Sequence, residues 1–407
     1  MITKIATKRF RSIEDQEIDL APITVFYGRT ASGKSSLLYS LLVLKNFLAN
    51  PNRQADAFFN LGFMDLGGFD QCCFDHEASK AITIRVCTSS TRNITHSYSI
   101  SLSKSSADLE LTAPNLRMTG RVSVPYPINQ AFPFELTEDG VQYQISWNGI
   151  VCTVTPKTPT AELQQLAQEK TRQVNDVPET LKRIDVAPHR RGFFKPNYTT
   201  GPAAPIATSE DEVASLIIND MNLAPRISAV TEEVFGRDFR LHNPPGTATV
   251  FFQTTHKKQR LPGLLVNDGF GVNQVVYILA KVFRQDMDTL LIEEPEVHLH
   301  PTIVRSLARQ LCTIAKEDSK QFLMTTHSEQ FVLSLLVAIS EGLISHEDVR
   351  FYLAEKEKKR TVFHEQKITP DGQVEGGLLS FMEAEMEDVR KFIARDRQGT
   401  HGQPGSQ

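Results

Sequence analysis

The fold of this chain is decided by the stretch Ile23-Thr24-Val25-Phe26-Tyr27-Gly28-Arg29-Thr30-Ala31-Ser32-Gly33-Lys34-Ser35-Ser36. Its first five residues form an apolar run between Pro22 and Gly28, which is typical of a buried strand. Residues 35–48 then carry leucine and phenylalanine at helical spacing before an Asn-Pro-Asn stop, which predicts a helix. The loop between them matches G-x-x-x-x-G-K-[ST] in full, in the strand, loop and helix context that this motif requires.

This loop has the residues that hold a nucleotide. Glycines allow backbone N–H groups to turn toward phosphates, Lys34 supplies a positive charge at the β and γ oxygens, and the Ser35 hydroxyl is a ligand for Mg²⁺. The alternative, a glycine-rich turn without a ligand, is disfavoured by the flanking strand and helix. We therefore expect ATP and Mg²⁺ to bind here, with the nucleotide held by Gly28, Arg29, Thr30, Ala31, Ser32, Gly33, Lys34, Ser35 and Ser36.

Two acids follow a second apolar strand, Leu290-Leu291-Ile292. The carboxyl ends of parallel strands meet at one edge of a sheet, so we expect Glu293 to face Mg²⁺ and Glu294 to face the attacking water. Adjacent acids alone more often mark a solvated strand end. The phosphate loop makes the pair specific, together with a later strand that ends at His327, whose ring could hydrogen-bond the γ-phosphate or the water.

The remaining patterns predict an α/β fold with three parts. Strands at 290–292 and 321–325 are separated by a helix at 301–315, and this alternation indicates a parallel sheet. Residues 81–154 alternate apolar and polar positions as an antiparallel β lobe does. Residues 160–183 and 209–235 are helical in pattern around a proline-rich stretch, which indicates an inserted helical segment. A closing hairpin is predicted from 349–353 and 361–364.

From these patterns we expect a P-loop NTPase head with a central, mainly parallel sheet, an antiparallel β lobe and a helical insertion. The head is predicted to be discontinuous, over residues 1–155 and 245–366, with the insertion or lid at 156–244. A C-terminal helical segment is expected at 367–397, and the Gly- and Gln-rich tail 398–407 is expected to be disordered.

Composition limits the partners. The chain has 407 residues and a formal net charge of −4, so it has no overall basic field to draw it onto nucleic acid. Three basic clusters (8–11, 189–191 and 256–260) could touch DNA, although such runs are usually solvated faces, so DNA stays a candidate partner. Five cysteines without C-x-x-C spacing fit reduced thiols, and no apolar run is long enough for a bilayer. We expect a cytoplasmic protein without membrane contact.

Together with Phe10-Arg11-Ser12, these motifs resemble the compact SMC/RecF/OLD-like ATPases of the ATP-binding-cassette (ABC) class, known from anti-phage and plasmid-maintenance operons. The run Glu293-Glu294-Pro295-Glu296-Val297-His298-Leu299-His300-Pro301 is similar to the E-E-P-E-x-H-L-H-P run of that family. The resemblance covers most of the chain outside residues 160–245. The phosphate loop departs from the family's G-x-N-G-S-G-K-S-S at its variable positions, which leaves the fine phosphate contacts open.

The resemblance implies further site residues. The stretch Asp268-Gly269-Phe270-Gly271-Val272-Asn273-Gln274 is similar to the family's signature loop, which reaches the γ-phosphate on the opposite subunit from the amino end of a helix. Read alone, it is a glycine turn before a core helix. It also differs from the transporter-type L-S-G-G-Q, so transporter coupling is not implied. By the same resemblance, Arg11 lies beside the nucleotide, and Gln71 contacts Mg²⁺ and water.

The implied mechanism is ATP hydrolysis at a homodimer or higher oligomer, with two heads enclosing two nucleotides between phosphate loop and opposing signature. OLD-type relatives carry a Toprim nuclease after the ATPase, and the stretch after residue 366 is too short for one, so we expect a separate effector. The expected role is a sensor or regulator in anti-phage defence or genome maintenance. The alternatives are a RecF-like module that clamps duplex DNA and a nucleotide-gated scaffold that hardly turns over.

Overall fold

The computed structural model describes residues 1–407 apart from 90–94, 128, 202–206, 259–260 and 379–407. Of the C-terminal helical segment expected at 367–397, residues 379–397 lie outside the described residues, as does the tail 398–407, and residues 367–378 contain no helix. No helix in the described part is both long and apolar enough to cross a membrane.

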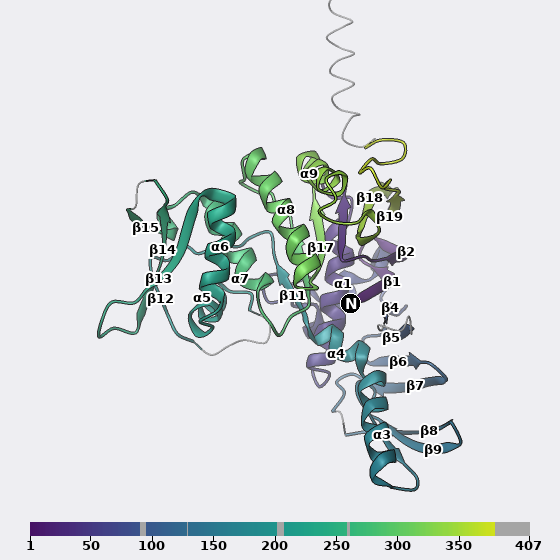
Figure 1. The fold of residues 1–407 in the computed structure, drawn as a ribbon. Helices are drawn as coiled ribbons and strands as arrows, with labels where there is room; N and C mark the ends of the chain where they lie inside the picture. Colours follow the sequence, from purple (N-terminus) through teal and green to yellow (C-terminus); the bar gives the residue numbers. More distant parts are fainter. Residues whose placement is uncertain (90–94, 128, 202–206, 259–260, 379–407) are drawn as a thin grey trace, which may run out of the picture.

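A six-stranded sheet lies at the centre of the molecule (Figure 1). Five of its strands are parallel and the last is antiparallel to its neighbour, which confirms the predicted mainly parallel sheet. Every residue of the second to fourth strands is buried, because the sheet is covered on both faces. In order, the strands are β11 (Ile184–Ala187), β16 (Thr289–Glu293), β17 (Gln321–Thr326), β3 (Ile23–Tyr27), β18 (Val349–Glu357) and β19 (Arg360–Gln366).

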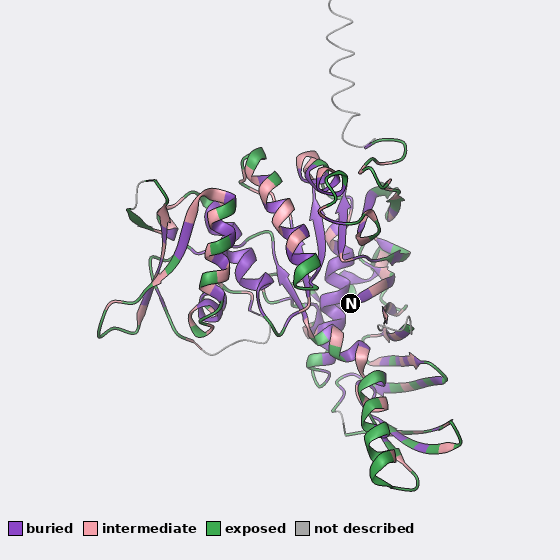
Figure 2. Cartoon of the chain, in the orientation of Figure 1, coloured by how far each residue is buried: buried purple, intermediate pink, exposed green. Residues whose placement is uncertain are grey.

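Helices cover this sheet and connect its parallel strands, so that these strands end at the same edge. The helix after the phosphate loop, α1 (Lys34–Ala49), is buried on nearly all sides (Figure 2), as its dense leucine content requires. Two amphipathic helices, α8 (Pro301–Glu317) and α9 (Glu329–Ser340), follow β16 and β17. Both strands therefore end at the edge of the sheet from which β3 enters the phosphate loop, as expected for parallel strands.

The antiparallel lobe is also confirmed. Its six-stranded sheet has the order β2-β1-β4-β5-β6-β7, and a three-stranded sheet has the order β10-β9-β8. Buried and exposed positions alternate along these strands, so one face of each packs inward around large side chains such as Tyr98 and Trp147. The strands are β1 (Ile2–Phe10), β2 (Ile13–Asp19), β4 (Ile82–Ser89), β5 (Thr95–Leu102), β6 (Ser106–Ala113), β7 (Leu116–Ser123), β8 (Phe132–Glu138), β9 (Val141–Trp147) and β10 (Cys152–Pro156).

The predicted insertion contains helices but is not only helical. Its helices are α3 (Ala161–Val174), α4 (Asp176–Lys182), α5 (Glu210–Asn219) and α6 (Leu223–Phe235). β11 lies inside the same residue range and is an edge strand of the central sheet, a pairing that its four residues do not reveal by pattern. A small second sheet lies beside α5 and α6 (Figure 1) and is made of β12 (Tyr198–Thr199), β13 (Arg237–His242), β14 (Thr249–His256) and β15 (Pro262–Leu264).

Short helical elements complete the fold, together with the core helix α7 (Phe270–Val282). Eleven of the thirteen residues of α7 are buried as a continuous run from Val272 onward, with Lys281 among them. The short elements are η1 (Ala55–Phe59), α2 (Gly68–Cys72), η2 (Phe74–His76), η3 (Leu265–Asn267) and η4 (His346–Asp348).

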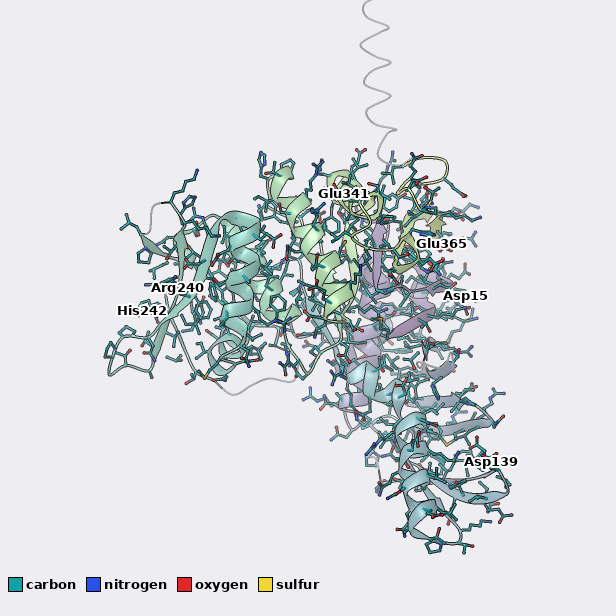
Figure 3. The ribbon with its side chains drawn as sticks, in the orientation of Figure 1. Asp15, Asp139, Arg240, His242, Glu341 and Glu365 are labelled. Atoms are coloured by element: carbon teal, nitrogen blue, oxygen red, sulfur yellow. The ribbon has the colours of Figure 1, made fainter. Side chains whose placement is uncertain are left out.

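A buried charge cluster fastens α7 to β11. The carboxylate of Asp185 is fully buried and lies 2.9 Å from Lys281 Nζ and 3.0 Å from Arg284 Nη1. We expect Asp185→Ala to lower the free energy of unfolding by about 3–5 kcal/mol, because the buried Lys281 loses its carboxylate partner and Arg284, among the described residues, keeps only Asp286. Urea unfolding measures this. Asp15→Ala is the matched control, since Asp15 pairs with Lys8 at the surface (Figure 3) and such pairs contribute about 0–1 kcal/mol. Equal losses in the two variants would contradict the prediction.

Candidate nucleotide-binding site

The phosphate loop borders a cavity of about 440 Å³ at the edge of the central sheet where its parallel strands end. The walls come from the loop, from α1, and from the ends of β16, β17 and β18, as well as from the turn between β1 and β2. The lining residues are Arg11, Ser12, Ala31, Gly33, Lys34, Ser35, Ser36, Tyr39, Met64, Glu294, Thr325, His327 and Lys356. The structure thus brings together the predicted loop, one of the two predicted acids and the predicted histidine.

Lys34 is held at the floor of this cavity. Its Nζ donates to the backbone oxygens of Gly28 and Arg29, each at 2.9 Å, and lies 3.0 Å from His327 Nε2. Burial lowers the pKa of Lys34 to about 8, and the nearby carboxylates of Glu294 and Glu296 oppose that shift. Among the described residues no carboxylate lies within ion-pair distance of this ammonium, which can therefore bind an anionic ligand.

The loop is closed from behind by two hydroxyl side chains. Thr361 on β19 donates its hydroxyl to the backbone oxygen of Ser32 at 2.7 Å, and its oxygen lies 2.7 Å from Ser12 Oγ. Gly33 has a φ of 98°, and a Cβ there would lie 2.2 Å from Thr361 Oγ1. Only glycine fits that position. Sequence reasoning missed Thr361, because its contact joins segments separated by most of the chain.

The two acids have different surroundings. Glu293 is 5% exposed, and its carboxylate accepts hydrogen bonds from Tyr39 Oη at 2.7 Å and from the backbone N–H of His189 at 3.2 Å. Glu294 lines the cavity, and its carboxylate oxygens lie 3.5 Å from His327 Nε2 and 3.3 Å from His189 Nδ1. Glu294 also has a φ of 47°, in the left-handed region that non-glycine residues rarely adopt.

His327 lies between Lys34 and Glu294 just after β17. Burial and the adjacent ammonium of Lys34 hold the pKa of His327 below its usual 6.5, against the pull of Glu294. The ring is therefore mainly neutral at pH 7 and can accept a hydrogen bond from the lysine. Lys34, His327 and Glu294 form a continuous polar row along the cavity.

The predicted signature residues separate into two groups. The loop does open a helix, because Gly269 caps the amino end of α7. Asn273 is 3% exposed and exchanges two hydrogen bonds of 2.6 Å with the backbone of Phe193. Gln274 is also buried, and Asp268 pairs with Arg237 at 3.0 Å. These three side chains are buried or paired within their own subunit. Gly269, Phe270 and Gly271 remain at least partly exposed to solvent, and Phe270 is 43% exposed.

Two residues suggested by the resemblance have different positions. Arg11 lines the cavity, with its guanidinium 5.5 Å above the Tyr39 ring. Gln71 is exposed on α2 and is not among the residues lining the cavity. The structure therefore brings Arg11 to the site, whereas the role of Gln71 stays a prediction.

The basic clusters do not form a free basic surface within the described residues. Lys8 pairs with Asp15, Arg9 with Glu77, and Lys257 with Glu232. Further out, Arg240 and His242 lie on the lobe at the left of Figure 3, and Arg240 pairs with Asp238. Arg191 is a missed site residue: it is 2% exposed and donates to the backbone oxygens of both Glu293 and Glu294.

The cavity fits a magnesium-bound nucleoside triphosphate by its donor set. Lys34 and Arg11 supply positive charge, and the buried hydroxyl of Ser32 has no partner among the described residues. Ser35 and the acids provide the oxygen ligands that Mg²⁺ prefers. Because both carboxylate oxygens of Glu293 already accept hydrogen bonds, it would approach the ion through its remaining lone pairs.

Comparisons with known proteins match two segments of the chain. Residues 4–149 match the AAA domain family, and residues 250–332 match the AAA ATPase domain family. An OLD nuclease from Thermus scotoductus is 37% identical over 67 residues, which are 16% of this chain and 13% of that protein. The chain thus aligns with a small part of its curated relative. Together the two matched segments include the phosphate loop, the signature region, the acids and His327.

Solved structures were compared as well. The SMC head domain from Thermotoga maritima has 9% identity and a TM-score of 0.44, covering 90% of this chain and 99% of that chain. An SMC head bound to the C-winged helix domain of ScpA has 12% identity and a TM-score of 0.47, covering 90% and 97%.

The mainly parallel sheet, the phosphate loop and the acids at the edge of the sheet define a P-loop ATPase fold. Two segments of the chain match the AAA domain and AAA ATPase domain families, and a short segment is similar to an OLD nuclease.

Proposed function

We propose that the protein binds ATP with Mg²⁺ and hydrolyses it between two heads, as an ATP-gated dimer. The observation that carries this proposal is the row of Lys34, His327 and Glu294 along one cavity, with 3.0 Å and 3.5 Å between neighbouring groups. A cation can stabilise charge on the γ-phosphate, and a carboxylate or a neutral imidazole can orient the attacking water or accept its proton.

Each residue has a distinct task in this proposal. The Lys34 ammonium and the backbone N–H groups of the loop bind the phosphates, and Arg11 contacts the nucleotide at the mouth of the cavity. Ser35 and Glu293 would hold Mg²⁺, which would supply positive charge to offset that of the phosphates. Glu294 accepts a proton from the attacking water, a bond forms from that oxygen to the γ-phosphorus, and the bond to ADP breaks. His327 orients the same groups by hydrogen bonding.

Two heads are needed because one head leaves the site incomplete. Gly269, Phe270 and Gly271 are not among the residues that line the cavity of their own subunit. They lie at the amino end of α7, where backbone N–H groups attract anions. A second copy would present this end to the γ-phosphate. ATP then joins the heads and hydrolysis releases them.

The proposed biological role depends on this ATP-dependent closing and opening of the dimer. We propose that the closed and open dimers signal to a separate effector in anti-phage defence or genome maintenance, since an ATP-dependent change in assembly is a suitable switch. The OLD relative is a nuclease by name, and the small aligned share does not carry that activity to this chain. Clamping of duplex DNA is the second candidate, and the ion pairs within the basic clusters do not favour it.

Purified protein should release phosphate from ATP when Mg²⁺ is present and stop when EDTA removes the metal, because the metal offsets the charge of the phosphates. The same sample should leave plasmid DNA and RNA intact, as expected for an effector that is separate. No phosphate release would favour the scaffold alternative. Nuclease activity that follows this protein through every purification step would contradict a separate effector.

A further inference from the structure

A short segment upstream of the acids, Pro188–Phe194, contacts both Glu293 and Glu294; we call it the acid strap. It follows β11, the edge strand of the central sheet on the side of α5 to α7 (Figure 1). β11 is parallel to β16, with Ala187 in register with Ile292. The strap therefore begins at the same edge of the sheet as the two acids at the end of β16, and it can lie alongside them.

The main chain of the acids is held by Arg191. Its Nη1 donates to the backbone oxygen of Glu293 at 2.5 Å, and its Nη2 donates to that of Glu294 at 2.7 Å. The same guanidinium also donates to the backbone oxygen of Pro188 at 2.9 Å, so strap and acids are joined at one point. Glu294 has an unfavourable positive φ, and such a conformation persists only where its surroundings hold it.

The side chain of Glu294 is held by His189. Its Nδ1 lies 3.3 Å from Glu294 Oε2, while His327 approaches Oε1 from the other side at 3.5 Å. The backbone N–H of His189 also donates to Glu293, so the residue contacts both acids. His189 does not line the nucleotide cavity, and its side chain is 58% exposed. Any effect on the reaction must therefore pass through the carboxylate that it touches.

The other end of the strap reaches the signature region. Phe193 exchanges two backbone hydrogen bonds with the buried Asn273 of α7, and the Phe194 ring lies 5.9 Å from that of Phe270. The strap is thus held at one end by Glu293 and Glu294 and at the other end by residues of the signature region. This explains why Asn273 is turned into its own subunit.

We propose that the acid strap is a positioning element for hydrolysis, in which Arg191 sets the backbone of Glu294 and His189 sets its carboxylate. The inference rests on the proposed ATPase function, because it gives His189 a task only if Glu294 activates water. The rate of hydrolysis falls steeply when the general base is displaced by even a small distance, whereas nucleotide affinity depends on the phosphate loop.

The experiment compares His189→Leu, which removes the ring nitrogen, with His189→Asn, whose amide nitrogen can take the place of Nδ1. Phosphate release by His189→Leu should fall roughly 10- to 100-fold at saturating ATP, with ATP affinity within about twofold of the unsubstituted protein. His189→Asn should recover most of the rate. The matched control is His364→Leu, because His364 Nε2 lies 3.4 Å from Glu355 in an exposed pair outside the site; its rate should not change.

Three outcomes would overturn the inference. One is a full rate for His189→Leu, another is no recovery in His189→Asn, and the third is a parallel loss of ATP affinity and melting temperature, which would indicate a structural role. A second readout needs no nucleotide: the ring ¹⁵N shifts of His189, assigned by their absence in His189→Leu, should move in Glu294→Gln. Unmoved shifts would refute the contact. If the unsubstituted protein released no phosphate but the shifts moved, the ATPase proposal would fail while the contact stood.

Discussion

Lys34→Ala is expected to abolish ATP binding. The ammonium is 5% exposed at the floor of the cavity and contacts only backbone oxygens and His327 in the described structure. Triphosphate oxygens would therefore gain a charge-assisted contact that no neighbouring side chain of the loop can replace. We expect affinity for Mg²⁺-ATP to fall about 100-fold or more, as measured by isothermal titration calorimetry.

The control for this variant is Lys358→Ala. Lys358 lies in the turn between β18 and β19, is exposed, and does not line the nucleotide cavity. ATP affinity should be unchanged there. Melting temperature without nucleotide is recorded for both variants, since removal of a buried lysine must not be mistaken for loss of the fold. Unchanged ATP affinity in folded Lys34→Ala would show that the nucleotide lies elsewhere.

Glu294→Gln is expected to trap the ATP-bound dimer. The amide keeps the size and much of the hydrogen bonding of the carboxylate beside His189 and His327, but it cannot accept the proton of the attacking water. Phosphate release should fall by about 10²–10⁴-fold, the usual contribution of a general base. With hydrolysis blocked, light scattering in ATP and Mg²⁺ should report dimeric or larger mass.

Adding Gly269→Arg to Glu294→Gln should remove that increase in mass. A Cβ on Gly269 meets nothing within 4 Å in its own subunit, and its φ of −55° suits any residue. The arginine would thus disturb only an approaching phosphate or partner. Gly271→Arg is a poorer choice, because its Cβ would lie 2.7 Å from Leu299 Cδ2 and would disturb the monomer.

The matched control is Gly263→Arg in the Glu294→Gln background. Gly263 is also exposed, has an ordinary backbone conformation, and has open space around its Cβ position. Dimerisation should persist in that variant. If Glu294→Gln/Gly269→Arg assembled as well as Glu294→Gln alone, the signature assignment would be wrong and one subunit would have to complete its own site.

Local pattern was sufficient for the phosphate loop and the strands around it. Residues 23–48 carry a continuous apolar run, a glycine loop and helical spacing in sequence, and each of these signals depends on near neighbours in the chain. The same holds for the apolar run before Glu293 and for the hairpin of β18 and β19. The pattern of a strand ending at His327 pointed to that residue and the resemblance added Arg11, and the structure places both at the cavity.

Tertiary structure alone decided how the site is supported. Nothing in the pattern of Ile184–Ala187 indicates an edge strand of the central sheet, because its pairing with β16 spans about a hundred residues of chain. Arg191 looks like part of a solvated basic cluster in sequence, yet it is buried under the two acids. Asn273 lies in the stretch that resembles the signature loop, which would contact the partner subunit, yet its side chain is hydrogen-bonded to Phe193 of its own subunit. A charge or an amide is drawn to whichever unpaired group the fold brings within about 3 Å, and only the folded chain determines which group that is.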